Sequence, residues 1–273
     1  MSADLGSSEA TARAFDQIAR DFGVPDIVWQ CAGGTQPGYF KDYSGAALEY
    51  EMRSNYFTAM HTAHAAIRLM HGAPPAAPAA TPAPAPTPTP APAAATPAAA
   101  ATATTTTTTA KRRHIVFTSS VLAFYPLAGY NSYSPAKAAM RALADGLRQE
   151  CLLYDIDVHC CFPATILSPG LAEEQKTKPE LTKILEGADE GQTADAVADI
   201  CLRKLQRGQT LVTTSLMGSA MRGAAWGGSP RGNVLVDTLF SWLLAVVWVA
   251  VGWAMDRDVR KYRRRLEAEG RSV

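Results

Sequence analysis

Tyr133 and Lys137 are the two residues of this chain whose types and spacing are best suited to chemistry. Side chains four residues apart share one face of a helix, so the Lys137 ammonium can lie beside the Tyr133 phenol. A nearby cation and a helix N-terminus both lower the pKa of a phenol from its ordinary value of about 10. The pair therefore predicts a tyrosine that donates a proton near neutral pH.

Two further residues support this prediction. Ser120 follows the apolar run 115–118, which is typical of a buried strand, and its hydroxyl could bond the same substrate oxygen as the phenol. Pro135 fits the first turn of a helix that begins near Tyr133, because proline is tolerated there and not deeper. Taken alone, the Tyr-x-x-x-Lys spacing is more often a solvated helix face, so the surrounding pattern has to support the catalytic interpretation.

The order of the expected elements indicates an α/β fold. Strand-like runs at 26–31, 114–118, 158–162 and 210–214 alternate with helical patterns at 8–22, 48–70, 131–154 and 193–205. Right-handed helical crossovers between parallel strands bring polar groups to the carboxyl edge of the sheet, where such folds bind ligands. The sequence therefore predicts a Rossmann-like, doubly wound parallel sheet with Ser120, Tyr133 and Lys137 at that edge.

These residues resemble those of the short-chain dehydrogenase/reductase family. Residues 26–34 resemble the strand that runs into that family's Asn-Ala-Gly loop, with Cys31 in place of the asparagine. The resemblance implies a catalytic group made of Ser120, Tyr133, Lys137 and Asn55, the last on the helix that carries the family's catalytic asparagine. It also implies that the cofactor contacts Asp4, Ala32, Gly33, Tyr133, Lys137, Pro163 and Ser168.

The loop after the strand 158–162 resembles that of one group within this family. Residues 168–179 place acidic residues before Lys-Thr-Lys-Pro and, together with an apolar C-terminal segment, resemble fungal members of the family that reduce long-chain sphingoid ketones. This resemblance implies NADPH as the cofactor and a long-chain sphingoid ketone as the substrate. It also implies the endoplasmic reticulum membrane as the location, with the reductase domain facing the cytosol.

Other functions stay open at this point. One is a reductase of the same family that acts on a retinoid, steroid or polyketide ketone, because Tyr133 and Lys137 would serve all of these substrates. The other is an inactive, membrane-bound remnant that binds an intact enzyme. A homo-oligomer is compatible with each of them.

The amino end departs from the family pattern. Family members open with a Thr-Gly-x-x-x-Gly-x-Gly loop whose amides hold the cofactor pyrophosphate, and Gly6, Gly23 and Gly33 form no such loop. We therefore expect a Rossmann-like fold that is truncated at its amino end, with the strand 27–31 as an unpaired sheet edge. We also expect the chain by itself to aggregate or to bind NADPH very weakly, and to show no reductase activity.

Composition divides the chain into four segments. Residues 74–110 are rich in Ala, Pro and Thr, which predicts a disordered insertion, with a partner-binding proline tract as the alternative. This insertion separates a partial reductase domain at 1–73 from its continuation at 111–232. Residues 233–273 hold an apolar segment and a basic tail.

The apolar segment 238–255 contains no charged residue before the tail 257–265. Its length is close to the roughly twenty residues that cross a bilayer, and Trp residues flank it, so we predict a membrane-associated helix. The alternative is a buried or oligomer-forming helix. Whether the segment spans the membrane or lies in its interface is left open, because a basic tail in the cytosol would place a cytosolic reductase domain on the wrong side of a single span.

The charged residues and the cysteines exclude other classes. A formal net charge of +1 argues against a nucleic-acid-binding protein, which carries a basic excess. The five cysteines have no metal-ligand spacing and indicate buried thiols in a reducing compartment. The five histidines form no cluster in the sequence, so we expect no metal site.

Overall fold

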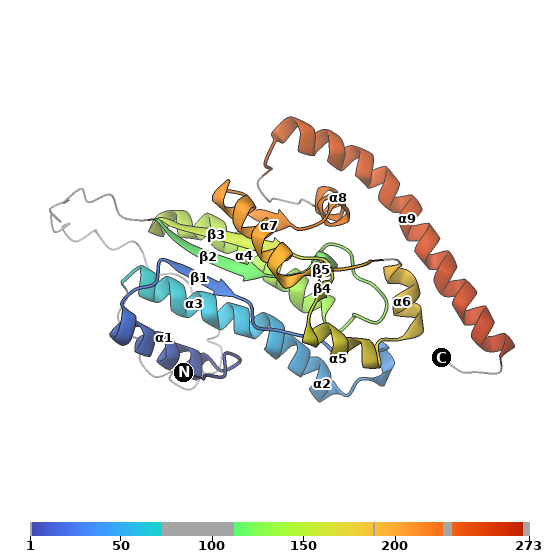
Figure 1. Cartoon of the computed structure of the whole chain (residues 1–273), viewed down its shortest axis with the longest axis horizontal. Helices are drawn as coiled ribbons and strands as arrows, with labels where there is room; N and C mark the ends of the chain where they lie inside the picture. The colour runs from blue at the N-terminus through green and yellow to red at the C-terminus, as the bar shows by residue number, and fades with distance from the viewer. Residues whose placement is uncertain (1, 73–111, 188, 226–230, 270–273) are drawn as a thin grey trace, which may run out of the picture.

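Four parallel strands form the main sheet of the computed structural model, in the order β1-β2-β3-β6 (Figure 1). They span Ile27–Gln30 (β1), Arg113–Thr118 (β2), Ile156–Phe162 (β3) and Leu211–Thr213 (β6). Every pair of neighbours is parallel, which confirms the predicted sheet. A second sheet, which was not predicted, pairs Ile166–Leu167 (β4) with Gln192–Thr193 (β5).

The structure describes residues 2–72, 112–187, 189–225 and 231–269. The predicted insertion at 74–110 lies outside these residues. The predicted division into segments at 1–73, 111–232 and 233–273 therefore remains a prediction.

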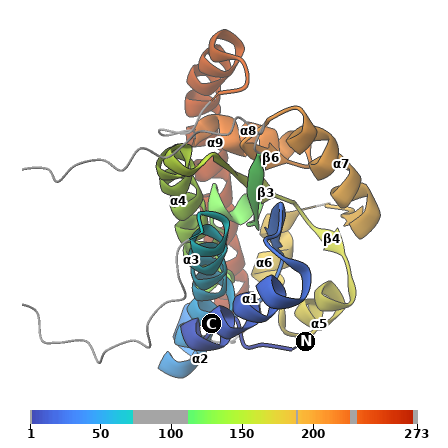
Figure 2. The same ribbon diagram turned by 90° about the vertical axis from the view of Figure 1, so that its left-hand side faces the viewer.

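Helices cover both faces of the main sheet (Figure 2). In chain order they are α1 (Ser8–Phe22), α2 (Gly45–Met52), α3 (Thr58–Met70), α4 (Ser134–Glu150), α5 (Pro169–Thr177), α6 (Glu180–Glu186), α7 (Ala194–Gln206), α8 (Leu216–Ala224) and α9 (Val234–Ala268). Helices α3 and α4 lie on one face, α7 lies on the other, and α1 packs against α3. The Rossmann-like arrangement of helices and strands is therefore present.

Alternating side chains of the strands divide the core in two, as the period of two in a strand requires. On the face of α3 and α4, Ile115, Phe117 and Val158 are fully buried among the helical residues. On the face of α7, Val116 and Val212 pack against that helix. These two apolar layers fix the strand register and hence the places where the strands end.

The predicted helix at 48–70 is in fact two helices joined by a π-helical turn at Arg53–Phe57. The side-chain amide of Asn55 in this turn donates to the main-chain oxygens of Gly34 and Glu51, at 2.8 and 3.0 Å. The helix predicted at 131–154 is also shorter: it begins at Ser134, and its last residues form a 3₁₀ turn at Cys151–Tyr154.

Strand β1 forms one edge of the main sheet, as expected, and Ile27 on it is 59% exposed. The prediction of buried thiols holds for Cys151, Cys160, Cys161 and Cys201. It is wrong for Cys31, which is exposed, because the residue lies just beyond the end of the edge strand.

Helix α9 runs past α8 and α6 along one side of the protein (Figure 1). The Trp248 ring meets the Tyr125 ring edge-on at 5.8 Å, and near the other end of the helix Arg265 forms an ion pair with Glu180. Residues 234–251 are long and apolar enough to cross a membrane by length and composition, yet only 6% of them are buried. This exposure argues against a buried core helix.

Candidate active site

The residues expected to act together come from three strand ends and the start of one helix. Gly33 follows β1, Ser120 follows β2 and Pro163 follows β3, while Tyr133 and Lys137 lie at the start of α4. Because the strands are parallel, their carboxyl ends meet at one edge of the sheet. The main-chain oxygen of Pro163 accepts the Val121 amide at 3.1 Å and so holds the Ser120 loop against the end of β3.

Ser120, Tyr133 and Lys137 are brought together as predicted. A hydrogen bond joins the side chains of Ser120 and Tyr133. The Lys137 Nζ lies 5.4 Å from the centre of the Tyr133 ring. The group therefore places a phenol, a hydroxyl and an ammonium around one point at the sheet edge.

Lys137 is a buried cation, with only 4% of the residue exposed. Its Nζ donates to the Thr118 main-chain oxygen at 3.0 Å, at the last residue of β2. The Ser119 hydroxyl donates to the Lys137 main-chain oxygen at 3.0 Å, which fixes α4 against the same strand end. Burial lowers the pKa of Lys137 to about 8, so the side chain changes charge close to neutral pH.

The predicted effect on Tyr133 is wrong in direction. Burial raises the pKa of Tyr133 above its ordinary value, and the charges of Glu174 and Glu51 add to this rise, while the hydrogen bond to Ser120 opposes it. Desolvation disfavours the phenolate more strongly than the hydrogen bond to Ser120 favours it. The phenol therefore stays protonated at neutral pH, which is the form a proton donor needs.

Gly33 allows Asn55 Oδ1 and Lys137 Nζ to lie close to the main chain that follows β1. Its φ of +146° lies in the region that favours glycine. A Cβ at this position would lie 2.7 Å from Asn55 Oδ1 and 3.4 Å from Lys137 Nζ. Glycine is required here because any side chain would fill the space between Asn55 and Lys137.

The side-chain oxygen of Asn55 accepts no hydrogen bond from the residues that the structure describes. Its Nδ2 makes the main-chain hydrogen bonds of the π-helical turn, but the buried Oδ1 has no partner in that part of the chain. A buried amide oxygen is costly without a donor. It is therefore suited to accept a hydrogen bond from a bound molecule or an ordered water beside Gly33.

The remaining predicted cofactor residues are held by local contacts. The Ala32 main-chain oxygen accepts the Gln30 side-chain amide at 2.6 Å, next to Gly33. Ser168 caps α5 by accepting the Leu171 amide at 3.2 Å. Asp4 accepts the Gly6 amide at 2.9 Å just before α1. Among the described contacts, none joins Asp4 or Ser168 to Tyr133 or Lys137, so their roles remain predictions.

A buried ionic cluster beside Tyr133 was missed by the sequence analysis. Lys178, whose side chain is 2% exposed, lies 3.2 Å from Glu174 Oε1 and 2.9 Å from Glu186 Oε2. The Tyr130 hydroxyl lies within hydrogen-bonding distance of both carboxylates, at 2.7 Å from Glu186, and its ring lies 6.1 Å from the Tyr133 ring. We call Tyr130, Glu174, Lys178 and Glu186 the lysine clamp.

The lysine clamp joins α5 and α6 to the loop that precedes α4. A second link supports it: the Thr182 hydroxyl donates to the Ala128 main-chain oxygen at 2.9 Å. The adjoining Gly129 has a φ of +96°, and a Cβ there would lie 1.9 Å from Thr182 Oγ1. The Lys-Thr-Lys-Pro motif was the available signal, since it contains Lys178.

Comparison with known proteins places this site in a family. The model of the short chain dehydrogenases matches residues 95–179. The chain is 33% identical to the 3-ketodihydrosphingosine reductase of Eremothecium gossypii, over 97% of this chain and 74% of that protein. The chain belongs to the short-chain dehydrogenase family.

Two further likenesses agree with this assignment. The chain is 37% identical to the 3-ketodihydrosphingosine reductase of Aspergillus fumigatus, over 92% of this chain, and spans 65% of that relative's length. A short-chain dehydrogenase from Sphingobium yanoikuyae, solved in complex with NADPH, shares the fold with a TM-score of 0.57 at 18% identity, covering 85% of this chain and 75% of that one.

Replacing Lys178 by Met should destabilise the chain, because it leaves two partly buried carboxylates without their cation. Breaking a buried ion pair in this way costs about 3–5 kcal/mol. Urea unfolding in detergent micelles measures the change. The matched control is Lys176→Met, two residues earlier in the chain: the Lys176 side chain is 65% exposed and pairs with Glu173, so its loss should cost less than about 1 kcal/mol. Equal effects of the two changes would show that the lysine clamp does not hold α5 and α6.

Proposed function

We propose that the chain carries the catalytic residues of an NADPH-dependent reductase that converts 3-ketosphinganine into sphinganine at the endoplasmic reticulum membrane, with its reductase domain in the cytosol. The buried Lys137 beside Tyr133 and Ser120 is the observation that supports the reaction type. The names of the fungal relatives, 3-ketodihydrosphingosine reductases, support the substrate.

Each residue of the site has a role in reducing a ketone. The Tyr133 phenol is protonated at neutral pH and donates its proton to the ketone oxygen as the carbonyl carbon is reduced. The Ser120 hydroxyl donates a hydrogen bond to the same oxygen. Lys137 keeps a positive charge beside the phenolate that is left, and a proton from solvent then restores the phenol.

The residues present fit the nicotinamide end of the cofactor. The unpartnered Asn55 Oδ1 can accept a hydrogen bond from a ribose hydroxyl, and Lys137 Nζ lies on the other side of the position that a Cβ on Gly33 would occupy. When bound, NADPH would supply the hydride that the ketone carbon receives. We identified no residue in the sequence that selects between NADPH and NADH. The choice of NADPH is therefore supported by the family resemblance.

The surface near the site suits a lipid-like substrate. The Ser120 loop packs on α8, where a Cβ on Gly218 would lie 2.9 Å from Val121 Cγ1, and Leu216 and Met217 on α8 are 84% and 62% exposed. Each methylene of a long-chain ketone gains about 0.8 kcal/mol in the bilayer, so the substrate stays in the membrane. An enzyme held at the surface reaches the ketone without transferring the chain into water.

Helix α9 is the proposed membrane anchor, and its contacts favour a position in the membrane interface over a span. The middle of its apolar segment touches the body of the protein, through Trp248 on Tyr125 and through Leu244 near Gly223. A span would pull these contacts into the hydrocarbon. The opposite side of the helix exposes Leu239, Trp242 and Val246 for the lipid.

Replacing Tyr133 by Phe should abolish reduction of 3-ketosphinganine, because the variant keeps the ring but lacks the proton donor. A loss of general acid catalysis of about 10²–10⁴-fold is expected. The assay uses an extended chain, in which a glycine-rich cofactor-binding segment of the short-chain dehydrogenase type precedes residue 2. NADPH binding should change little.

The matched control is Tyr154→Phe, in the 3₁₀ turn that follows α4, where the ring packs on His71. This variant should keep its activity. Retained activity in the Tyr133 variant would contradict the assignment of the proton donor. A faster reaction with a retinoid, steroid or polyketide ketone than with 3-ketosphinganine would instead contradict the assignment of the substrate.

Replacing Trp242 by Gln should weaken membrane binding several-fold, because the residue is 76% exposed on the lipid side of α9. Flotation of the chain with phospholipid vesicles measures bound and free fractions. Leu153→Gln is the control, since Leu153 is 77% exposed but lies in the 3₁₀ turn that follows α4 and not on α9. An equal loss in both variants would show that binding does not depend on this face.

A further inference from the structure

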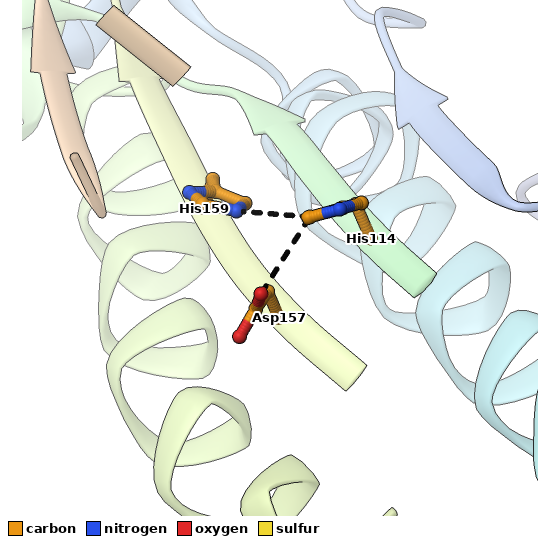
Figure 3. Close-up of side chains that lie close together, drawn as sticks. All are labelled: His114, Asp157 and His159. Atoms are coloured by element: carbon orange, nitrogen blue, oxygen red, sulfur yellow. Dashed lines mark hydrogen bonds and ion pairs between the residues drawn. The ribbon is translucent and has the colours of Figure 1, made fainter. Parts of the chain in front are cut away.

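His114, Asp157 and His159 lie close together on the main sheet (Figure 3). The strand register brings them there: His114 on β2 is the partner of Asp157 on β3, and His159 follows two residues later on the same face. A nitrogen of each imidazole and a carboxylate oxygen all lie within 4.8 Å of one another. The expectation that the histidines form no cluster is therefore wrong.

The spacing of the ligand atoms suits a small transition-metal ion. The distance from His114 Nδ1 to His159 Nε2 is 3.4 Å, and from His114 Nδ1 to Asp157 Oδ2 it is 3.9 Å. Metal–ligand bonds of about 2.0–2.2 Å at tetrahedral angles place ligand atoms about 3.3–3.6 Å apart. The two imidazoles already have this separation, and the carboxylate needs only a small shift.

His159 is held in the form that binds a metal. Its Nδ1 donates to the Gln209 main-chain oxygen at 2.8 Å, because a carbonyl can only accept. In the neutral ring the lone pair is therefore on Nε2, the atom that faces His114. An imidazole oriented by a carbonyl on its other nitrogen is the usual arrangement of a metal-ligating histidine.

The site is open to solvent on one side. His114 and Asp157 are partly exposed, with side-chain exposures of 36% and 29%, so an ion can enter and keep a water ligand. Arg112 lies 3.5 Å from Asp157 Oδ2 and competes with an ion for this carboxylate. Its side chain is 60% exposed and can turn into solvent.

We propose that His114, Asp157 and His159 form a binding site for a divalent transition-metal ion of the zinc type, with water as the fourth ligand. Two imidazoles and one carboxylate are ligands that Zn²⁺ accepts. The site lies toward the amino ends of β2 and β3, whereas Ser120 and Pro163 follow their carboxyl ends. The ion would therefore link two central strands and stabilise the sheet without entering the ketone chemistry.

Zinc binding to the metal-free chain in detergent micelles tests the proposal, by competition with a chromophoric chelator. All proteins carry Cys31→Ser, because an exposed thiol could bind zinc by itself. One equivalent should bind, and the thermal midpoint should rise with zinc concentration, since a ligand that binds only the folded state stabilises it. Absence of binding at micromolar zinc would overturn the proposal.

Four further variants show whether the ion is where we place it. His114→Gln and Asp157→Asn, both at partly exposed positions, should each weaken binding by at least about tenfold, as loss of a supporting group already does in metal sites. Arg112→Gln should tighten binding, because it frees the carboxylate. His64→Gln is the control, on the exposed side of α3, and should leave the affinity unchanged. Equal affinity in His114→Gln and His64→Gln would place any bound zinc elsewhere.

Discussion

The burial of the Lys137 ammonium is the constraint on which the rest of the site depends. Removing an ammonium from water costs several kcal/mol unless acceptors and opposite charge replace the solvent. The structure offers it the Thr118 main-chain oxygen at the end of β2 and the charge of Glu51. Even so, burial lowers the pKa of Lys137 to about 8. The site is therefore built around a cation that is held close to losing its proton.

The surrounding elements follow from that burial. Gly33 must lack a side chain because Lys137 Nζ and Asn55 Oδ1 lie on either side of the space that a Cβ would fill. The π-helical turn at Arg53–Phe57 brings Asn55 to this space, and such turns are frequent at functional sites. On the other side, the lysine clamp holds α5 and α6 beside Tyr133 through a second buried ammonium, which lies between two carboxylates.

The sequence was sufficient for the features that depend on local pattern. Apolar strands, the Ser8–Phe22 helix and the grouping of Ser120, Tyr133 and Lys137 at the sheet edge follow from periodicity and from the rule for parallel strands. The direction of the Tyr133 pKa shift could not be predicted, because it depends on how much water the folded site excludes. The cluster of His114 and His159 depends on the register of two strands whose residues are distant in the sequence.

The pH dependence of kcat/KM for ketone reduction by the extended chain tests the role of Lys137 most directly, because this ratio reports the pKa values of the free enzyme. If the ammonium is needed, the ratio falls with rising pH above about 8, and Tyr133, whose pKa is raised, does not contribute to this limb. In Lys137→Arg, which keeps its charge, the remaining activity should lose the limb. A wild-type profile that stays level far above pH 8, or the same limb in Lys137→Arg, would contradict the account.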